Sequence, residues 1–375
     1  MTNSIDYVGK VVYMGIDVHK ATYVCVSICE SAVVKRDTLS ADSQSLLHYM
    51  NKHFHGAKIN SAYEAGFSGF HLHRFLIQNG VNNIIVNPSS IEISSRDRVK
   101  TDKRDALKIA TQLSVQRLRG IYVPSIEQES KRHVTRLRSN IWKLNHQIGG
   151  RIKSLLFTQG PIKSDDKTRL TKKWLTEKLL EIKEKEYPDD LYYVVNQYVE
   201  EWLNLTEKIK KIEEQLKIQA KSESDLHAIY TSGPGIGLIH GRELANELGD
   251  MSRFSNEKQL FSYAGLTPSE YSSGEHTRQG HISRQGRPVI RKIMVEASWV
   301  AIEKDPNLRE VFDRIAARKG KKRAIVAVAR RYLGRLRSCA MNGTLYEIKT
   351  TKKEDKDQTI RKLNTYSIIQ ERALV

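Results

Sequence analysis

Four acids have the residue type and spacing that could hold metal ions for phosphate chemistry. Asp17 ends the apolar run "VVYMGID", and Glu64 stands near the end of the strand-like run "KINSAYEA". Asp102 and Asp105 are three residues apart in "KTDKRDALK", a spacing that places both carboxylates on one face of a helix. If the strand ends meet that helix, the four carboxylates offer the oxygen ligands that two Mg²⁺ ions prefer, with a substrate phosphate completing the coordination.

A purely structural interpretation of these acids stays open. Asp is a common capping residue at helix starts, and Asp102 or Asp105 could pair with the neighbouring Lys100, Lys103 or Arg104. The tripeptide "GID" after a first strand also occurs in actin-like ATPases and sugar kinases. Those folds need Gly-rich phosphate loops after later strands, and residues 1–125 offer little of that kind. An RNase H-like nuclease therefore explains the acids better than a kinase does.

The elements that must position the acids form a predicted α/β domain over residues 1–125. Alternating apolar residues predict strands, and apolar residues at steps of three and four predict helices. The predicted strands are 11–17, 21–28, 32–39, 58–65 and 82–88, and the predicted helices are 42–54, 69–80 and 102–116. Three strands that can form a meander, followed by alternating helix and strand, predict a mixed sheet. Cys25, Cys29 and Cys339 are expected to be free thiols, the first two on one strand face.

Residues 126–225 are predicted to form a helical arm. Apolar residues at helical spacing are expected on one face of its first helix, namely Leu137, Ile141, Leu144, Ile148, Ile152 and Leu155. A second amphipathic stretch covers residues 195–220. The pattern favours an antiparallel hairpin or coiled coil, and a plain helical bundle stays an alternative.

A mostly α-helical C-terminal domain is predicted over residues 226–345, followed by a charged tail at 346–375. The domain opens with "SGPGIG", a turn between helices that resembles a helix-hairpin-helix element and could hold a phosphate on backbone N–H groups. The turn lacks the Lys-Ser/Thr pair of a Walker loop. Two further helices are predicted at 289–304 and 321–340.

The charge of the chain predicts a polyanionic partner. Lys and Arg number 62 against 43 acids, a formal net charge of +19, and such an excess favours binding of nucleic acid. No apolar run approaches the roughly 20 residues of a membrane-spanning helix. The N-terminal segment has no basic start followed by an apolar core, so we expect a cytoplasmic protein.

Two separate blocks of motifs carry a resemblance to a known family. "GIDVHK", "YEAG" and "TDKRDA" in the first domain, and "SGPGIG", "FSYAGLTPSEYSSG" and "RQGHISRQGRPVIRK" in the last, resemble the insertion-sequence "one-ten" transposase family. That family includes Piv-type DNA invertases and bridge-RNA-guided recombinases. The resemblance covers nearly the whole chain, with the motifs in the same order.

The resemblance implies specific roles for residues of this chain. The four metal-binding acids fall on Asp17, Glu64, Asp102 and Asp105, in a domain similar to the RuvC resolvase. The serine nucleophile falls on Ser273 in the Tyr-x-Ser-Gly segment, with Ser272 as the less favoured neighbour. The family further implies a Mg²⁺-dependent transposase that cuts and rejoins donor and target DNA through a phosphoserine. It also implies a structured guide RNA and a dimer or tetramer in which the acids and the serine come from different subunits.

Basic residues near the serine segment and later in the domain are candidate phosphate contacts, because Arg pairs well with phosphate. They are Arg278, Arg284, Arg287, Arg291, Lys292, Lys321, Lys322 and Arg323, and a solvated helix surface explains each of them about equally well. His276 and His281 could carry protons. Two other functions stay open: a junction-resolving nuclease that uses water as its nucleophile, and a nucleic-acid-binding protein without catalytic activity.

Overall fold

The computed structural model describes residues 6–92, 101–163, 167–185, 187–270 and 279–348. The chain divides into two compact units, Met1–Pro124 and Ser125–Val375. The finer division predicted at 225/226 and 345/346 stays a prediction. Among the helices of the described ranges, none combines the length and apolar character needed to cross a bilayer.

The first unit is built on a five-stranded sheet in the order β3-β2-β1-β4-β5. The strands are β1 (Val11–Val18), β2 (Thr22–Cys29), β3 (Ala32–Ser40), β4 (Lys58–Glu64) and β5 (Asn82–Val86). The first three form an antiparallel meander, whereas β4 runs parallel to β1 and β5 parallel to β4. This topology confirms the predicted RNase H-like mixed sheet.

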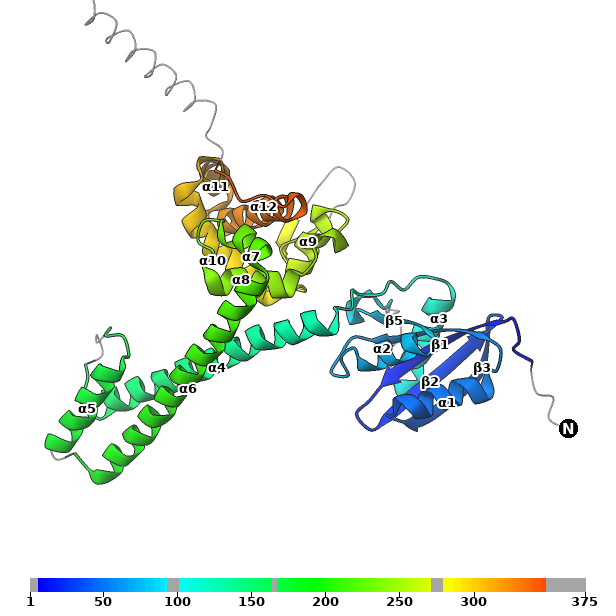
Figure 1. Ribbon diagram of the computed structural model, residues 1–375, viewed down its shortest axis with the longest axis horizontal. Coiled ribbons are helices and arrows are strands. Elements are labelled where there is room, and N and C mark those ends of the chain that lie inside the picture. The colour runs from blue at the N-terminus through cyan, green and yellow to red at the C-terminus, as the bar shows by residue number, and fades with distance from the viewer. Residues whose placement is uncertain (1–5, 93–100, 164–166, 186, 271–278, 349–375) are drawn as a thin grey trace, which may run out of the picture. The chain divides into compact units, whose positions relative to one another are not determined.

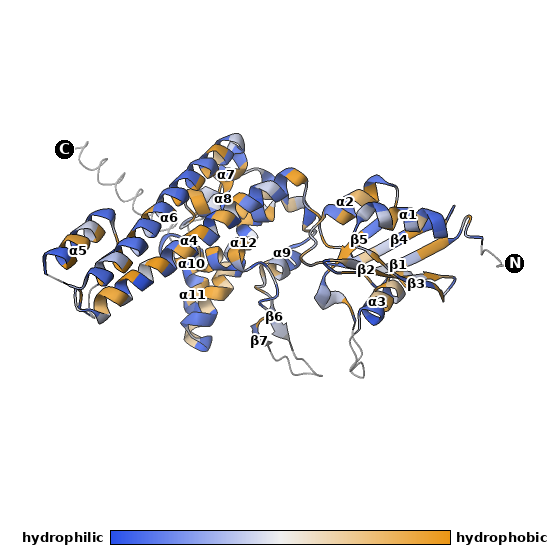
Figure 2. Cartoon of the chain, turned by 90° about the horizontal axis from the view of Figure 1, so that it is seen from below, coloured by the Kyte–Doolittle hydropathy of each residue, from blue (hydrophilic) through white to orange (hydrophobic). Residues whose placement is uncertain are grey.

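Helices cover both faces of this sheet (Figure 2). They are α1 (Ser43–His53), α2 (His71–Gln78) and α3 (Asp102–Ser114), with a short 3-10 turn at Pro88–Ser90. Strand β2 shows why two layers form, because successive side chains of a strand point to opposite faces. Cys25 and Cys29 pack with α1 and α2, and Val24 and Val26 pack against α3. Both cysteines are buried and free, as predicted.

The second unit begins with a helical arm of α4 (Ile126–Thr158), α5 (Lys172–Glu184) and α6 (Asp189–Ser222). Helices α4 and α6 lie side by side, with α5 packed at one end of the pair (Figure 1). They run antiparallel, because Arg138 of α4 pairs with Glu213 at 2.8 Å while the later Asn145 donates to the Trp202 carbonyl at 2.9 Å. Three helices share a core only at the α5 end, around Ile152, Leu156 and Ile182 among others.

The predicted apolar face of α4 is wrong over its first half. Leu137 and Leu144 are 50% and 47% exposed, whereas Arg132 and Thr135, and further along Gly149, are buried. The first half of α4 therefore packs through polar and small residues, which a periodicity of apolar residues does not detect. Only toward the α5 end does the predicted face, with Ile152 buried, match the packed one.

The remaining helices surround a second apolar core. They are α7 (Ser224–Thr231), α8 (Leu238–Leu248), α9 (Glu257–Ala264), α10 (Pro288–Lys304), α11 (Pro306–Lys319) and α12 (Lys321–Asn342), with a 3-10 turn at Met251–Arg253 and a hairpin of β6 (Pro268–Glu270) and β7 (Gln279–Ile282). Helix α11 was not predicted separately. Its sequence signal is the Asp305 cap, whose carboxylate accepts from the N–H groups of Asn307 and Leu308, with Pro306 in the first turn.

Buried charges join the start of α4 to α8. Arg132, 3% exposed, donates from Nε to the Asn246 carbonyl and from Nη2 to the Glu247 carbonyl, both at 2.9 Å. It thereby caps the C-terminal end of α8. The Glu247 carboxylate accepts from Arg136 at 2.9 and 3.2 Å. These contacts fix the base of the arm against α8.

Candidate active site

Two of the four predicted acids stand at the same edge of the sheet. Strands β1 and β4 are parallel neighbours, and their register pairs Ile16 with Tyr63. Asp17 and Glu64 are the next residues on each strand, so both stand at the carboxyl end of the strand pair. The carboxyl ends of parallel strands are the usual position for functional side chains in α/β domains.

Helix α3 lies directly on β1 because Gly15 has no side chain. A Cβ at Gly15 would lie 2.1 Å from the Ala106 carbonyl oxygen and 2.5 Å from the Ala110 nitrogen. Ala106 and Ala110 are fully buried and are among the side chains that α3 packs on the sheet. The close approach puts the first turn of α3, which carries Asp102 and Asp105, beside the end of β1. The helix macrodipole favours acids in that turn.

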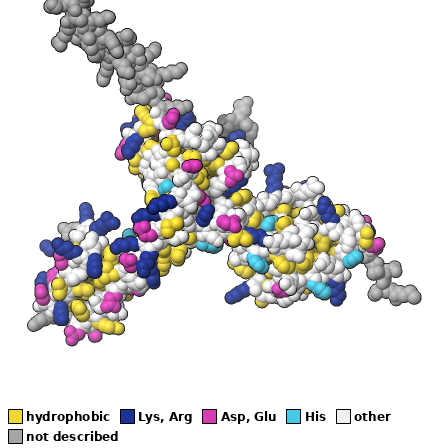
Figure 3. Space-filling view, viewed as in Figure 1, with side chains coloured by type: hydrophobic (Ala, Val, Ile, Leu, Met, Phe, Trp, Pro, Cys, Tyr) yellow, Lys and Arg dark blue, Asp and Glu magenta, His cyan; other side chains and the backbone are white. Residues whose placement is uncertain are grey.

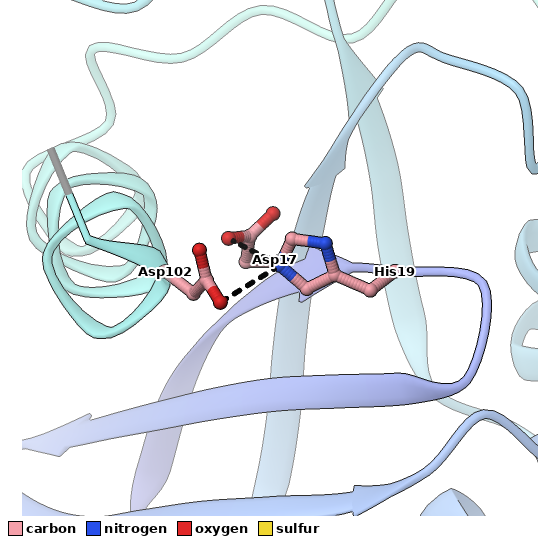
Figure 4. Close-up of side chains that lie close together, drawn as sticks. All are labelled: Asp17, His19 and Asp102. Atoms are coloured by element: carbon pink, nitrogen blue, oxygen red, sulfur yellow. Dashed lines mark hydrogen bonds and ion pairs between the residues drawn. The ribbon is translucent and has the colours of Figure 1, made fainter.

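Asp17, His19 and Asp102 form a compact cluster, shown in Figure 4. Their ligand atoms lie within 4.8 Å of one another. His19 Nε2 lies between the two carboxylates, 3.2 Å from Asp17 Oδ2 and 3.3 Å from Asp102 Oδ2. Asp17 is the least exposed of the three side chains at 22%, followed by His19 at 41% and Asp102 at 61%. The cluster is therefore open to solvent on the α3 side.

The pKa of Asp17 is raised above its ordinary value. Burial is the largest cause, His19 opposes it, and the negative charges of Asp102 and Asp105 add to it. A carboxyl that is costly to ionise alone gains from a cation placed among these acids.

Asp105 and Glu64 lie outside the three-residue cluster. Asp105 accepts from Lys108 at 3.2 Å within α3, and it is close enough to Asp17 to raise that pKa. Glu64 is exposed at the end of β4. The structure thus brings Asp17 and Asp102 into direct proximity, sets Asp105 one turn further along, and leaves Glu64 at the same sheet edge.

The donor set suits a divalent cation. Carboxylate oxygens are the ligands that Mg²⁺ and Mn²⁺ prefer, and the imidazole of His19 adds a nitrogen at the same place. Sequence reasoning missed His19, although it lies within the quoted motif "GIDVHK". The position of His19 could have identified it, because a residue that closely follows an acid at a strand end can turn back toward that acid.

Ser273 and its neighbour Ser272 lie outside the described residues, as does His276. The hairpin that flanks them is described on both sides, since β6 ends at Glu270 and β7 begins at Gln279. Its base is held by backbone bonds from Ser283 N to the Thr267 carbonyl at 2.8 Å and from Arg287 N to the Tyr263 carbonyl at 2.7 Å.

Glycines allow the two chain segments at this base to meet. A Cβ on Gly286 would lie 2.2 Å from the Gly265 nitrogen and 2.3 Å from the Tyr263 carbonyl oxygen. Gly265 itself has φ +68° and forms the left-handed C-cap of α9. The base of the hairpin is thus a fixed support for the serine segment.

The predicted basic residues fall into two groups, and Arg278 lies outside the described residues. Arg291 donates to the Ala264 carbonyl at 3.2 Å, and Arg287 lies 3.9 Å from Glu247. Lys292 is 3.8 Å from Glu296 and lies over the Trp142 ring. These three have partners within the fold. By contrast, Arg284 and the helix-start residues Lys321, Lys322 and Arg323 are exposed.

The "SGPGIG" turn has a packing role. A Cβ on Gly235 would lie 2.9 Å from the Ala297 carbonyl oxygen of α10, and a Cβ on Gly233 would lie 2.3 Å from the Tyr332 hydroxyl of α12. Tyr332 also donates to the Pro234 carbonyl at 2.9 Å. Close packing against two helices accounts for these glycines without a bound phosphate.

Comparisons with known proteins agree with both motif blocks. A transposase model of the DEDD type from IS110 elements matches residues 14–161, and the model described as "Transposase IS116/IS110/IS902 family" matches residues 227–313. Protein y4qE of Sinorhizobium fredii is 28% identical over 237 residues, which cover 63% of this chain and 57% of that protein.

In two further relatives, the match extends over a larger share of the relative's length. The transposase of insertion sequence element IS1111A from Coxiella burnetii is 24% identical over 265 residues, covering 69% of this chain and 71% of the relative. The pilin gene-inverting protein of Moraxella bovis is 24% identical over 335 residues, covering 86% of this chain and 93% of the relative.

Proposed function

Because the chain belongs to the IS116/IS110/IS902 family of transposases, we propose that it cuts and rejoins DNA through Ser273, assisted by Mg²⁺ at the sheet edge. The observation that carries the proposal is the cluster of Asp17, His19 and Asp102, within 4.8 Å, in the domain that matches the DEDD model. Glu64 ends the neighbouring strand β4 and Asp105 lies in the first turn of α3 with Asp102, and the proposal assigns both to the same set of four acids.

Asp17 and Asp102 would hold the first cation, with Glu64 and Asp105 available for a second. A bound divalent cation stabilises the charge that develops on a phosphate under attack. The protein's part is to keep the carboxylates ionised and fixed in place. Gly15 would fix Asp102 by seating α3 on β1, and His19 would orient the two carboxylates because its Nε2 lies between them.

Ser273 would act as a nucleophile toward phosphorus. Its Oγ forms a bond to phosphorus as a strand P–O bond breaks, so the phosphodiester energy is kept in a covalent intermediate for rejoining. A free serine hydroxyl is weakly nucleophilic and needs an activating site. The acids lie in the first unit and Ser273 in the second, and the proposal includes a dimer or tetramer whose sites are composed from different subunits.

The partners are proposed on the family resemblance. They are donor and target DNA in the cytoplasm and a structured guide RNA whose loops pair with both DNAs. Side chains would then hold backbones, while base pairing would select the sequence.

A two-plasmid recombination assay with a test for covalent attachment of labelled DNA examines this proposal. Ser273→Ala should abolish both recombination and attachment, and Ser272→Ala should retain both. Asp17→Asn should abolish both without loss of folding. DNA cutting that persists in Ser273→Ala without attachment would instead indicate water as the nucleophile. Recombination that survives both serine substitutions would refute the serine mechanism.

A further inference from the structure

A basic groove lies between the β6–β7 hairpin and the α11–α12 pair. Its volume is about 990 Å³, and of the 17 described residues that line it eight are Lys or Arg and none is Asp or Glu. One wall is formed by Pro268 of β6 and by Gly280 to Ile282 of β7. In Figure 2 the hairpin and α11 extend from the same side of the domain.

Among the described residues, no acid pairs with the eight cations of the groove. The arm differs, because its Lys and Arg side chains are interspersed with Asp and Glu (Figure 3) and several of them form ion pairs, such as Lys210 with Glu207. Eight unpaired cations around one groove repel each other, and a polyanion in the groove would relieve that repulsion.

The groove is apolar at its centre. Leu266, Ile282, Ile315 and Val326 are among its lining residues and are buried or partly buried, while Arg318, Lys319 and Lys322 on its margin are exposed. Cations outside and apolar side chains inside fit a strand that has phosphates on one side and unpaired bases on the other. A duplex keeps the faces of its bases stacked inside, so it would leave the apolar centre largely unused.

The backbone at Arg284 is held in an uncommon conformation. Its φ is +56°, the left-handed region that non-glycine residues rarely adopt. Such strain persists where surrounding contacts fix it and is concentrated at binding sites. Arg284 follows β7 and lines the groove, so the strained residue lies between the groove and the fixed hairpin base.

We propose that this groove binds one strand of DNA in single-stranded form beside the β6–β7 hairpin, whose two strands flank Ser273 in the sequence. Among the described residues that line the groove, no side chain carries an acceptor oxygen, so a ribose 2′-hydroxyl would find no side-chain oxygen as a partner there. DNA therefore fits the groove better than RNA. The identity of the strand as the one that is cut rests on the proposed function, whereas binding itself requires neither Ser273 nor the acids.

Fluorescence anisotropy of the full-length protein in EDTA tests the groove apart from catalysis. The probes are a labelled mixed-sequence DNA single strand of about 16 nucleotides, the same RNA single strand, and the DNA duplex. The test variant is Lys319→Gln/Lys322→Gln, and the matched control is Lys208→Gln/Lys211→Gln, which removes two exposed lysines of α6. Thermal melting of both variants should match that of the unmodified chain.

Each single-strand phosphate contact contributes about 0.7 to the slope of log K against log salt concentration. Loss of two contacts should therefore lower the slope by about 1.4, which makes the weakening between about 50 and 200 mM salt some sevenfold smaller. The control should keep the original slope. The proposal is overturned if the test variant loses as much slope with the DNA duplex as with the DNA single strand, or loses slope with the RNA strand only. It is also overturned if the slopes of the test and control variants do not differ. If the expected slope loss is found but the unmodified protein does not recombine DNA, the result counts against the proposed function alone.

Discussion

Replacing Gly15 with Ala tests whether the acids depend on the close seating of α3. The added Cβ would lie 2.1 Å from the Ala106 carbonyl oxygen and 2.5 Å from the Ala110 nitrogen, where ordinary contact begins at 3.4 Å. Both opposing atoms are backbone, so no side-chain rotation can relieve the overlap. Helix α3 has to move away from β1 by about 1 Å, and Asp102 moves with it.

The displacement should cost stability and, more sharply, function. Overpacking of this size costs about 1–3 kcal/mol, which a domain of ordinary stability, about 5–15 kcal/mol, survives. A displacement of about 1 Å in a catalytic group can reduce the rate about 100-fold. We therefore expect a folded Gly15→Ala protein with recombination reduced about 100-fold and with weaker Mn²⁺ binding.

Calorimetric titration with Mn²⁺ and the two-plasmid assay measure these effects, and a melting curve establishes folding. Gly150→Ala is the control, because a Cβ there meets nothing within 4 Å and Ala is favoured over Gly in a helix. If Gly15→Ala binds Mn²⁺ and recombines DNA as well as the control, the seating of α3 does not position the acids and the reasoning is refuted.

Two further predictions concern charges whose surroundings are known. Burial raises the pKa of Asp17 above its unfolded value, so its stabilising contribution is complete below the unfolded pKa, about 3.9, and is lost as pH rises through the folded pKa. In EDTA, the Asp17→Asn variant should therefore have a higher melting temperature than the unmodified chain at pH 7 and the same melting temperature at pH 3.5. Added Mn²⁺ should raise the melting temperature of the unmodified chain only. A lower melting temperature for the variant in EDTA at pH 7 would contradict this prediction. Arg132→Ala should lower the free energy of unfolding by about 3 kcal/mol, because two α8 carbonyls lose their buried donor. The exposed Lys210→Ala, measured by the same denaturant titration, should change it by less than about 0.5 kcal/mol, and equal effects would disprove a role for Arg132 as a cap.

The sheet and two of its acids were predictable because local pattern determines them. Alternation in "VVYMGID" and "KINSAYEA" predicts two strands. The acid near the end of each strand can be identified from the sequence without knowing how the strands pair. The parallel pairing that puts Asp17 and Glu64 at one edge depends on long-range contacts that no short pattern contains. The role of Gly15 also depends on a long-range contact. A glycine in a strand indicates that another segment packs closely against it, but the sequence does not show that this segment is α3.

Packing by polar residues explains where the sequence misled. Steps of three and four in α4 predicted an apolar face through Leu137 and Leu144, yet the packed face carries Arg132 and Thr135. Buried arginine is rare enough that composition argues against it. It becomes favourable only when carbonyls and carboxylates from α8, more than a hundred residues later, converge on it.

The effect of the net charge of +19 also depends on which cations are paired with acids in the fold. Summed over the chain, it favours nucleic acid but does not say where that partner binds. Arg138 and Lys210 count toward the sum although each lies beside a glutamate of α6. Lys319 and Lys322 count equally, but none of the described residues that line their groove is an acid. Since a paired cation contributes little field at a distance while unpaired neighbours reinforce each other, the attraction for DNA should be strongest beside the hairpin that flanks Ser273.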